Sequence, residues 1–203
     1  MIKTTLFAAV AAAALTAAPA SAAVMTYVGT ADGGLTQIGP NAGTSVTSTI
    51  SVLDDFLITD INVEVNLEHT WVGDLDIDLI GPDLTTVRLM GDNGLFVDGS
   101  SGDDLVMTIF DDEALVSITT AQAADAPYTQ SWIPREALSI FDGTSSLGDW
   151  TLRITDTVNV DGGTFGNWRL TIEGEPVDVS EPGALGLLGL GLAGLAVGRR
   201  RRQ

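Results

Sequence analysis

Residues 61–68, INVEVNLE, alternate apolar and polar side chains without a break. Successive side chains of a β-strand point to opposite faces of the sheet, so this period of two predicts a half-buried strand. Trp150 and Trp168 are the first residues of two further alternating stretches, and each takes the same side of its strand as the apolar residues that follow. We therefore expect both tryptophans in the core. The same alternation is present in residues 46–52 (VTSTISV), 74–79 (DLDIDL), 150–155 (WTLRIT) and 168–173 (WRLTIE).

Turn-forming residues separate these stretches. Clusters of Gly, Pro, Asn and Asp stand at residues 81–83, 91–94, 142–143 and 161–163, and the apolar runs 87–90 and 105–110 add two candidate strands. Between the two ends of the chain, no stretch keeps a helical period. The sequence therefore predicts a single all-β domain, an antiparallel β-sandwich or jelly roll of about eight strands.

The first 23 residues have the pattern of a secretory signal peptide. Lys3 gives a positive start, an alanine-rich apolar run follows, and Ala20-Ser21-Ala22 supplies small residues at the cleavage positions. We expect a signal helix over residues 1–23 that signal peptidase removes after Ala22 or Ala23.

The last residues show a second export pattern. Residues 183–198 contain only Gly, Ala, Leu and Val, and the run Arg199, Arg200, Arg201 and Arg202 follows. As a helix the apolar run would be about 24 Å long, against a hydrocarbon core of about 30 Å. The sequence predicts a short transmembrane helix over residues 183–198, with residues 199–203 as a basic cytoplasmic tail.

Ser180-Glu181-Pro182 precedes that helix and completes a tripartite pattern that resembles the PEP-CTERM sorting signal of Gram-negative bacteria. Ser180 departs from the usual proline, whereas Glu181, Pro182, the apolar span and the basic end match. The resemblance implies processing by exosortase, transient anchoring in the inner membrane, and a final place at the cell surface or outside the cell.

The charge and the residue composition of the chain exclude several classes of function. The chain has nine basic residues, 27 acidic residues, one histidine and no cysteine. Removing Lys3 and the four terminal arginines leaves four basic residues; only Glu181 of the acidic residues is removed with them, so the body carries a net charge of −22. Such a body is unsuited to nucleic acid, which requires clustered cations. The absence of cysteine excludes disulfides, thiolate zinc sites and a cysteine nucleophile.

Residues 69–82, HTWVGDLDIDLIGP, are similar to the signature of the P domain, or P/Homo B domain, of proprotein convertases and bacterial subtilisin-like proteases. Residues 110–114 (FDDEA), 150–152 (WTL), 161–165 (DGGTF) and 168–172 (WRLTI) follow in the order of the family. The resemblance covers residues 44–174 and implies an eight-stranded jelly roll. It leaves residues 24–43 as a lead-in and residues 175–182 as a linker that holds the sorting motif.

In convertases this domain stabilises a neighbouring catalytic domain, which holds the catalytic Asp, His and Ser. About 20 residues between the signal and the P domain leave no room for one here, and His69 falls inside the P-domain motif, where we expect a structural, half-buried side chain. We therefore predict no enzyme activity and a binding or structural role. The alternatives are an accessory module of a separate subtilisin-like protease and a carbohydrate-binding module for exopolysaccharide.

Two sets of side chains are candidate sites. Carboxylates in turns supply the oxygen ligands that Ca²⁺ prefers, and a highly acidic exported protein gains from bound cations; the candidates for a structural calcium ion are Asp74, Asp111, Asp112 and Asp142. Trp71 and Trp132 stand in or near loops and are the candidate stacking platform for a ligand. Asp76 and Asp78 alternate with core residues, and we expect them on a solvated strand face.

Overall fold

The computed structural model describes residues 22–91 and 102–177. The expected signal helix and transmembrane helix, and the sorting residues 180–182 and 199–202, lie outside the described residues. Within the described ranges, no helix has the length and apolar character needed to cross a membrane.

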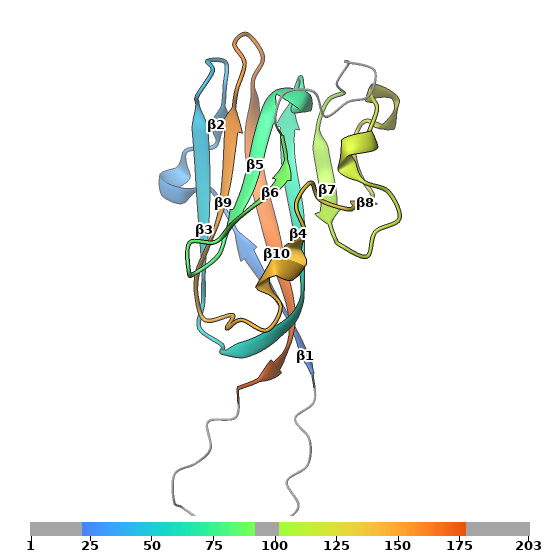
Figure 1. Cartoon of the computed structure of the whole chain (residues 1–203). Coiled ribbons are helices and arrows are strands. Elements are labelled where there is room, and N and C mark those ends of the chain that lie inside the picture. The colour runs from blue at the N-terminus through green and yellow to red at the C-terminus, as the bar shows by residue number, and fades with distance from the viewer. Residues whose placement is uncertain (1–21, 92–101, 178–203) are drawn as a thin grey trace, which may run out of the picture.

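Two β-sheets pack face to face and form a sandwich (Figure 1). The six-stranded sheet has the order β1-β10-β4-β7-β8, with β2 also paired to β10, and the four-stranded sheet has the order β3-β9-β5-β6. All pairings are antiparallel except β7 with β8. This architecture confirms the predicted all-β sandwich, with ten strands where about eight were expected.

The strands of the larger sheet are β1 (Ala23–Gly29), β2 (Gln37–Ile38), β4 (Phe56–His69), β7 (Leu105–Phe110), β8 (Ser131–Trp132) and β10 (Gly163–Pro176). Those of the smaller sheet are β3 (Ser45–Val52), β5 (Leu75–Ile80), β6 (Thr86–Met90) and β9 (Gly148–Asp156). Short 3₁₀ helices lie in the connections: η1 (Asp32–Gly34), η2 (Val72–Asp74), η3 (Ile118–Thr120), η4 (Ala123–Asp125) and η5 (Leu138–Phe141).

The core lies between the sheets and contains the alternating residues predicted from the sequence. Ile61, Val63, Val65 and Leu67 of β4 are at most 2% exposed. Trp150 and Trp168 are completely buried, and the indole Nε1 of Trp168 donates a hydrogen bond of 2.8 Å to the buried hydroxyl of Ser48. Burying this apolar area is the main stabilising contribution of the fold.

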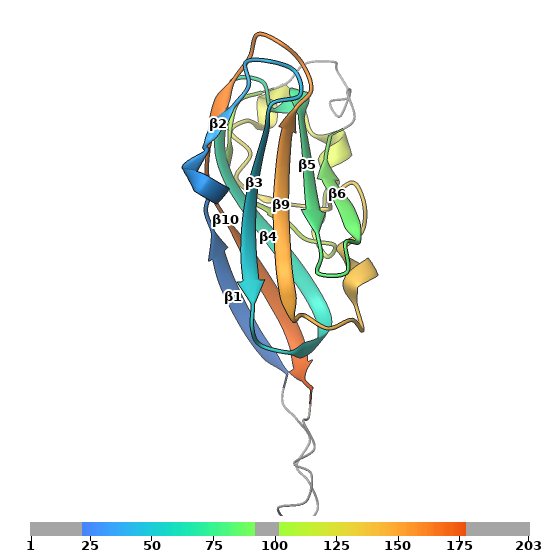
Figure 2. The same cartoon turned by 90° about the vertical axis from the view of Figure 1, so that its left-hand side faces the viewer.

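The domain begins earlier than residue 44. β1, which was expected to belong to the lead-in, pairs with β10 from Ala23 to Gly29 and forms an edge of the larger sheet (Figure 2). The residues of β1 alternate between the inner and the outer side of the sheet. Val24 and Val28 are exposed on the outer side, so apolar residues occur on both sides. The alternation of apolar and polar residues that predicted the other strands is therefore weak in β1. At the other end, β10 continues to Pro176.

Candidate functional site

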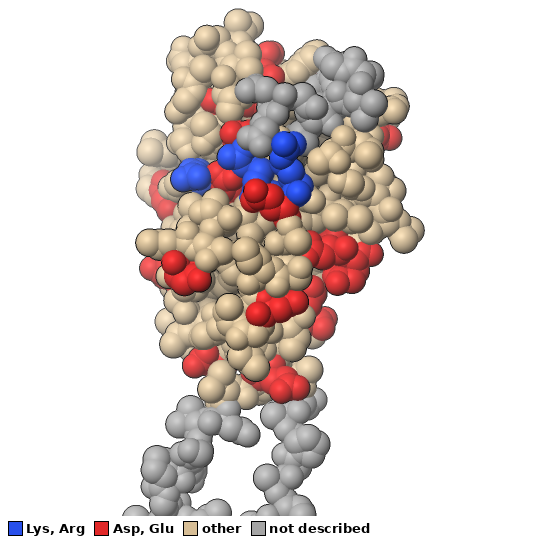
Figure 3. All heavy atoms as spheres, viewed as in Figure 1, with Lys and Arg blue, Asp and Glu red and all other residues tan. Residues whose placement is uncertain are grey.

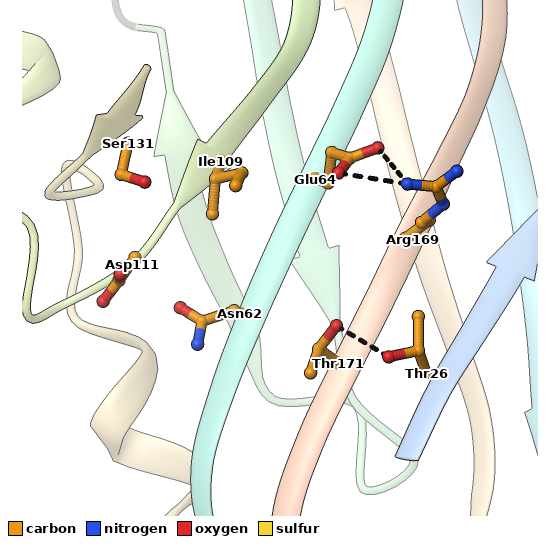
Figure 4. Close-up of a pocket in the computed structure, with 8 residues that line it drawn as sticks. All are labelled: Thr26, Asn62, Glu64, Ile109, Asp111, Ser131, Arg169 and Thr171. Atoms are coloured by element: carbon orange, nitrogen blue, oxygen red, sulfur yellow. Dashed lines mark hydrogen bonds and ion pairs between the residues drawn. The ribbon is translucent and has the colours of Figure 1, made fainter. Parts of the chain in front are cut away.

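The outer face of the larger sheet has a polar hollow of about 370 Å³ (Figure 4). Strands β1, β10, β4, β7 and β8 contribute outward side chains to it, because residues two apart on neighbouring strands share one face. The lining residues are Thr26, Asn62, Glu64, Ile109, Asp111, Ser131, Arg169 and Thr171.

Most of its polar groups already bind one another. Nη1 of Arg169 donates to both carboxylate oxygens of Glu64, at 3.0 and 3.3 Å, and the hydroxyls of Thr26 and Thr171 lie 3.2 Å apart (Figure 4). The side-chain oxygen of Asn62 is buried and has no hydrogen-bond partner. The hollow therefore offers hydroxyl, amide, carboxylate and guanidinium groups that can form hydrogen bonds to a polar ligand.

Negative charge accumulates at one end of this hollow. Asp60, whose carboxylate accepts a 2.9 Å hydrogen bond from Nδ2 of Asn62, has its pKa raised, first by burial and then by the charges of Glu173 and Asp111. Burial and the charge of Asp112 likewise raise the pKa of Asp142. In both cases like charges and partial desolvation disfavour the ionised form.

The four candidate calcium ligands do not form one group. Phe110 pairs with Val63, so Asp111 lies level with Asn62, whereas Asp74 follows the end of β4 at His69, roughly 23 Å away at about 3.3 Å per residue. Both carboxylate oxygens of Asp112 accept backbone N–H groups, from Leu138 at 3.0 Å and Ser139 at 2.9 Å.

Two further observations bear on metal binding. Oδ1 of Asp111 accepts the N–H of Glu113 at 2.7 Å. Across residues 22–91 and 102–177, no three His, Cys, Asp or Glu side chains come close enough together to hold a metal ion. Among the described residues, the four carboxylates are therefore not gathered into one cluster.

The tryptophan platform is not present as predicted. Trp132 is only 1% exposed and its ring packs edge-on against Tyr128, with the centroids 6.1 Å apart. Its two-residue strand pairs in parallel with the end of β7, which turns the indole inward. Trp71 is 39% exposed, so only one of the two aromatic rings offers a face to a ligand.

His69 is more deeply buried than expected, at 1% exposed. Its Nδ1 accepts the backbone N–H of Trp71 at 3.1 Å, which places the proton of a neutral ring on Nε2. Nε2 faces Oδ2 of Asp156 at 3.7 Å. The imidazole therefore fixes the turn after β4.

Asp78 also departs from the prediction of a solvated side chain. It is 3% exposed because Arg88 and Arg153, on the two neighbouring strands, cover it. Arg153 donates to Oδ2 from Nη2 at 2.8 Å, Nε of Arg88 donates to Oδ1, and Arg88 also pairs with Asp76 at 2.9 Å. The four side chains form an ionic network on the outer face of the smaller sheet.

The described part of the chain is thus a two-sheet β-sandwich in which the single histidine is buried in a contact between loops. The family model of the proprotein convertase P-domain matches residues 58–172, more than half of the chain, and the chain belongs to this family. The PEP-CTERM protein-sorting motif matches residues 178–202, so the protein is exported and sorted to the cell surface in Gram-negative bacteria.

Three similar proteins or structures that bear a name are proteases or a protease complex. The chain is 33% identical over 133 residues to a transglutaminase-activating metalloprotease of Streptomyces mobaraensis; this match covers 65% of the chain but only 13% of that protein. A chain in the crystal structure of the Aeromonas sobria serine protease and chaperone complex matches with a TM-score of 0.52 and 16% identity, over 77% of this chain and 28% of that one. The serine protease of Aeromonas sobria alone gives 0.50 and 16%, over 76% and 27%. At this identity the two structures show a shared fold.

Proposed function

We propose that this exported protein acts by binding or by structural support, and that its P domain does not catalyse a reaction. The observation that carries the proposal is the environment of His69. Serine proteolysis needs a nucleophile, a base and oxyanion donors in contact. Here Nδ1 of the only histidine is held by the Trp71 amide and Nε2 faces Asp156 inside the protein.

Peptide hydrolysis tests this proposal. Purified protein is incubated with a mixed casein substrate, with and without a fluorophosphonate that labels active-site serines. No hydrolysis and no labelling support the proposal. Hydrolysis that the reagent stops would overturn it.

A role as accessory module of a separate subtilisin-like protease is the second candidate. It is supported by the family, whose P domains are accessory modules of proteases, and by the protease relatives. A pull-down from the secretome with the folded domain as bait tests it. Recovery of a subtilisin-like chain would favour this candidate, and its absence would favour an envelope role.

A carbohydrate-binding role for exopolysaccharide is the third candidate, supported by the polar hollow around Asn62 and by the exposed face of Trp71. A glycan array tests it, with Trp71→Ala and Asn62→Ala as variants. The candidate fails if neither variant weakens a measured glycan signal.

Cleavage of the sorting signal by exosortase and binding of a structural calcium ion remain predictions from the sequence. For the sorting signal, we propose exosortase cleavage after transient anchoring, and a mature C-terminus near Glu181 in the measured mass supports it. For calcium, crowded carboxylates such as Asp60 and Asp142 would gain from a cation. Calorimetry on EGTA-treated protein tests this: neither heat of binding nor a raised melting temperature would refute a calcium role.

A further inference from the structure

A small apolar hollow of about 280 Å³ lies beside the turn between β5 and β6. The second wall is the segment that follows η5, and Figures 1 and 2 both show this turn and η5 side by side. The lining residues are Pro82, Asp83, Phe141, Thr144, Ser145 and Leu147. We refer to it as the Leu147 pocket.

The core fixes the floor and one wall of the Leu147 pocket. Phe141 is 2% exposed and packs edge-on against Trp150, with ring centroids 4.9 Å apart. A Cβ on Gly81 would lie 2.7 Å from the Phe141 ring, so only glycine lets the turn approach it. Gly148, at φ +128°, gives Pro82 the same close approach. The pocket is therefore formed before any partner arrives.

Leu147 in the pocket, and apolar residues next to its lining residues, are exposed to solvent. Leu147 is 47% exposed; Ile140, next to Phe141, is 60% exposed; and Leu84, in the same turn as Pro82, is 80% exposed. Leu57, which bridges to Ser145, is 45% exposed. Exposed apolar side chains grouped around a concave floor are typical of protein-binding surfaces.

The polar groups of the pocket are already occupied. The hydroxyl of Thr144 donates to the carbonyl of Phe141 at 2.7 Å, and the hydroxyl of Ser145 donates to Asp55 at 2.6 Å. The two carboxylate oxygens of Asp83 accept the amide and the hydroxyl of Thr85, at 2.9 and 2.8 Å. A sugar would therefore find few free hydrogen-bonding groups, whereas an apolar side chain needs none.

The surroundings of the pocket are acidic. Asp83 is in the wall, Asp55 binds Ser145, Asp142 follows Phe141 and Asp149 follows Gly148. No lining residue is basic. On the face shown in Figure 3, the arginines form one group in the upper part, whereas carboxylates are spread over the whole face. This field favours a positively charged partner.

We propose that the Leu147 pocket docks one aromatic or large aliphatic side chain from a basic polypeptide segment of a partner protein. The side chain buries its apolar surface on Phe141, Pro82 and Leu147, while flanking Arg or Lys residues face the surrounding carboxylates. The inference rests on the proposed binding role and names the class of partner that this role requires.

Fluorescence anisotropy tests the proposal with a labelled heptapeptide, Arg-Arg-Gly-Phe-Gly-Arg-Arg, and the folded domain. One control peptide replaces the phenylalanine by serine, and another replaces the four arginines by glutamates. We expect the first peptide to bind at least about tenfold more tightly than either control, and to weaken as salt screens the carboxylates.

Variants locate the binding. Leu147→Ser should weaken binding about tenfold, and its matched control is Leu35→Ser, an exposed leucine (74%) in the connection between β1 and β2. Asp83→Asn should weaken binding of the arginine peptide, with exposed Glu68→Gln on the larger sheet as control. Melting curves show that each variant is folded.

Equal binding of the phenylalanine and serine peptides would overturn the proposal, because charge alone would then explain it. Equal losses in Leu147→Ser and Leu35→Ser would overturn it as well, since the pocket would not be the place of contact. A secretome partner that still binds the Leu147→Ser variant would leave the binding role intact and reject only this pocket. The two proposals thus fail separately.

Discussion

Nε2 of His69 lies 3.7 Å from Oδ2 of Asp156, with both side chains completely buried, and this contact joins the ends of β4 and β9, one from each sheet. Among the described residues, neither atom has a hydrogen-bond partner. Oδ1 of Asp156 accepts the N–H of Val158 at 3.0 Å, so the same carboxylate also shapes the turn that follows β9. The pair therefore fixes two loops at one end of the sandwich.

Removing either partner should destabilise the fold. Asp156→Ala removes the carboxylate that faces Nε2 of the imidazole, and we expect a loss of about 3 kcal/mol in the free energy of unfolding. Urea denaturation measures it. The exposed Asp125→Ala serves as comparison, with a small loss expected from its N-cap bond to Gln122. A loss below about 0.5 kcal/mol for Asp156→Ala would contradict the structural role of the pair.

Asp78 should be the most important carboxylate of the outer face. Asp78→Ala leaves Arg88 and Arg153 without their shared partner, and we expect a loss of about 2–3 kcal/mol, reduced because Arg153 is 43% exposed. Glu64→Ala breaks the more exposed pair with Arg169 and should cost about 1 kcal/mol or less. Equal losses in the two variants would show that burial of Asp78 adds nothing.

The two candidate platform tryptophans should behave differently. Trp132→Ala removes a ring that is 1% exposed, and we expect a loss of about 3–5 kcal/mol in stability. Trp71→Ala, at 39% exposed, should cost only about 1 kcal/mol in stability. Thermal or urea unfolding compares them. A stable Trp132→Ala variant would contradict the inward position of this ring.

Tyr27 should give the protein an alkaline transition. Burial, together with the 3.1 Å hydrogen bond to Asp54, raises the pKa of Tyr27 from its ordinary value of 10.0 to about 12. Because the folded pKa lies above the unfolded one, this contribution to stability is complete below about pH 10 and is lost as the pH rises toward 12. Alkaline titration by tyrosinate absorbance should show the late transition.

The Tyr27→Phe variant identifies that transition. The chain has two tyrosines, so the variant leaves only Tyr128 to titrate. If the step that Tyr27→Phe removes lies near pH 10 in the wild-type protein, the Asp54 contact is not made in solution.

Local alternation made the strands predictable. A period of two in the sequence fixes which face of a strand a side chain occupies. The inward position could therefore be predicted for residues such as Ile61, Val63, Trp150 and Trp168. β1, β2 and β8 were missed. β1 has exposed valines among its outer residues, and β2 and β8 have only two residues each, too few for a period. For the same reason Trp132 was placed in a loop.

The sequence by itself determined the class of fold, the inward faces of the main strands, the family and the sorting signal. Only the tertiary structure decided which side chains meet: Asp78 with two arginines, His69 with Asp156, Phe141 with the turn at Gly81. The physical reason is the distance along the chain over which each feature is determined. Which face of a strand is buried depends on the residues next to each other in the chain. These contacts depend instead on the register between strands that are far apart in the sequence, and His69 and Asp156 are 87 residues apart. No local pattern encodes such a register.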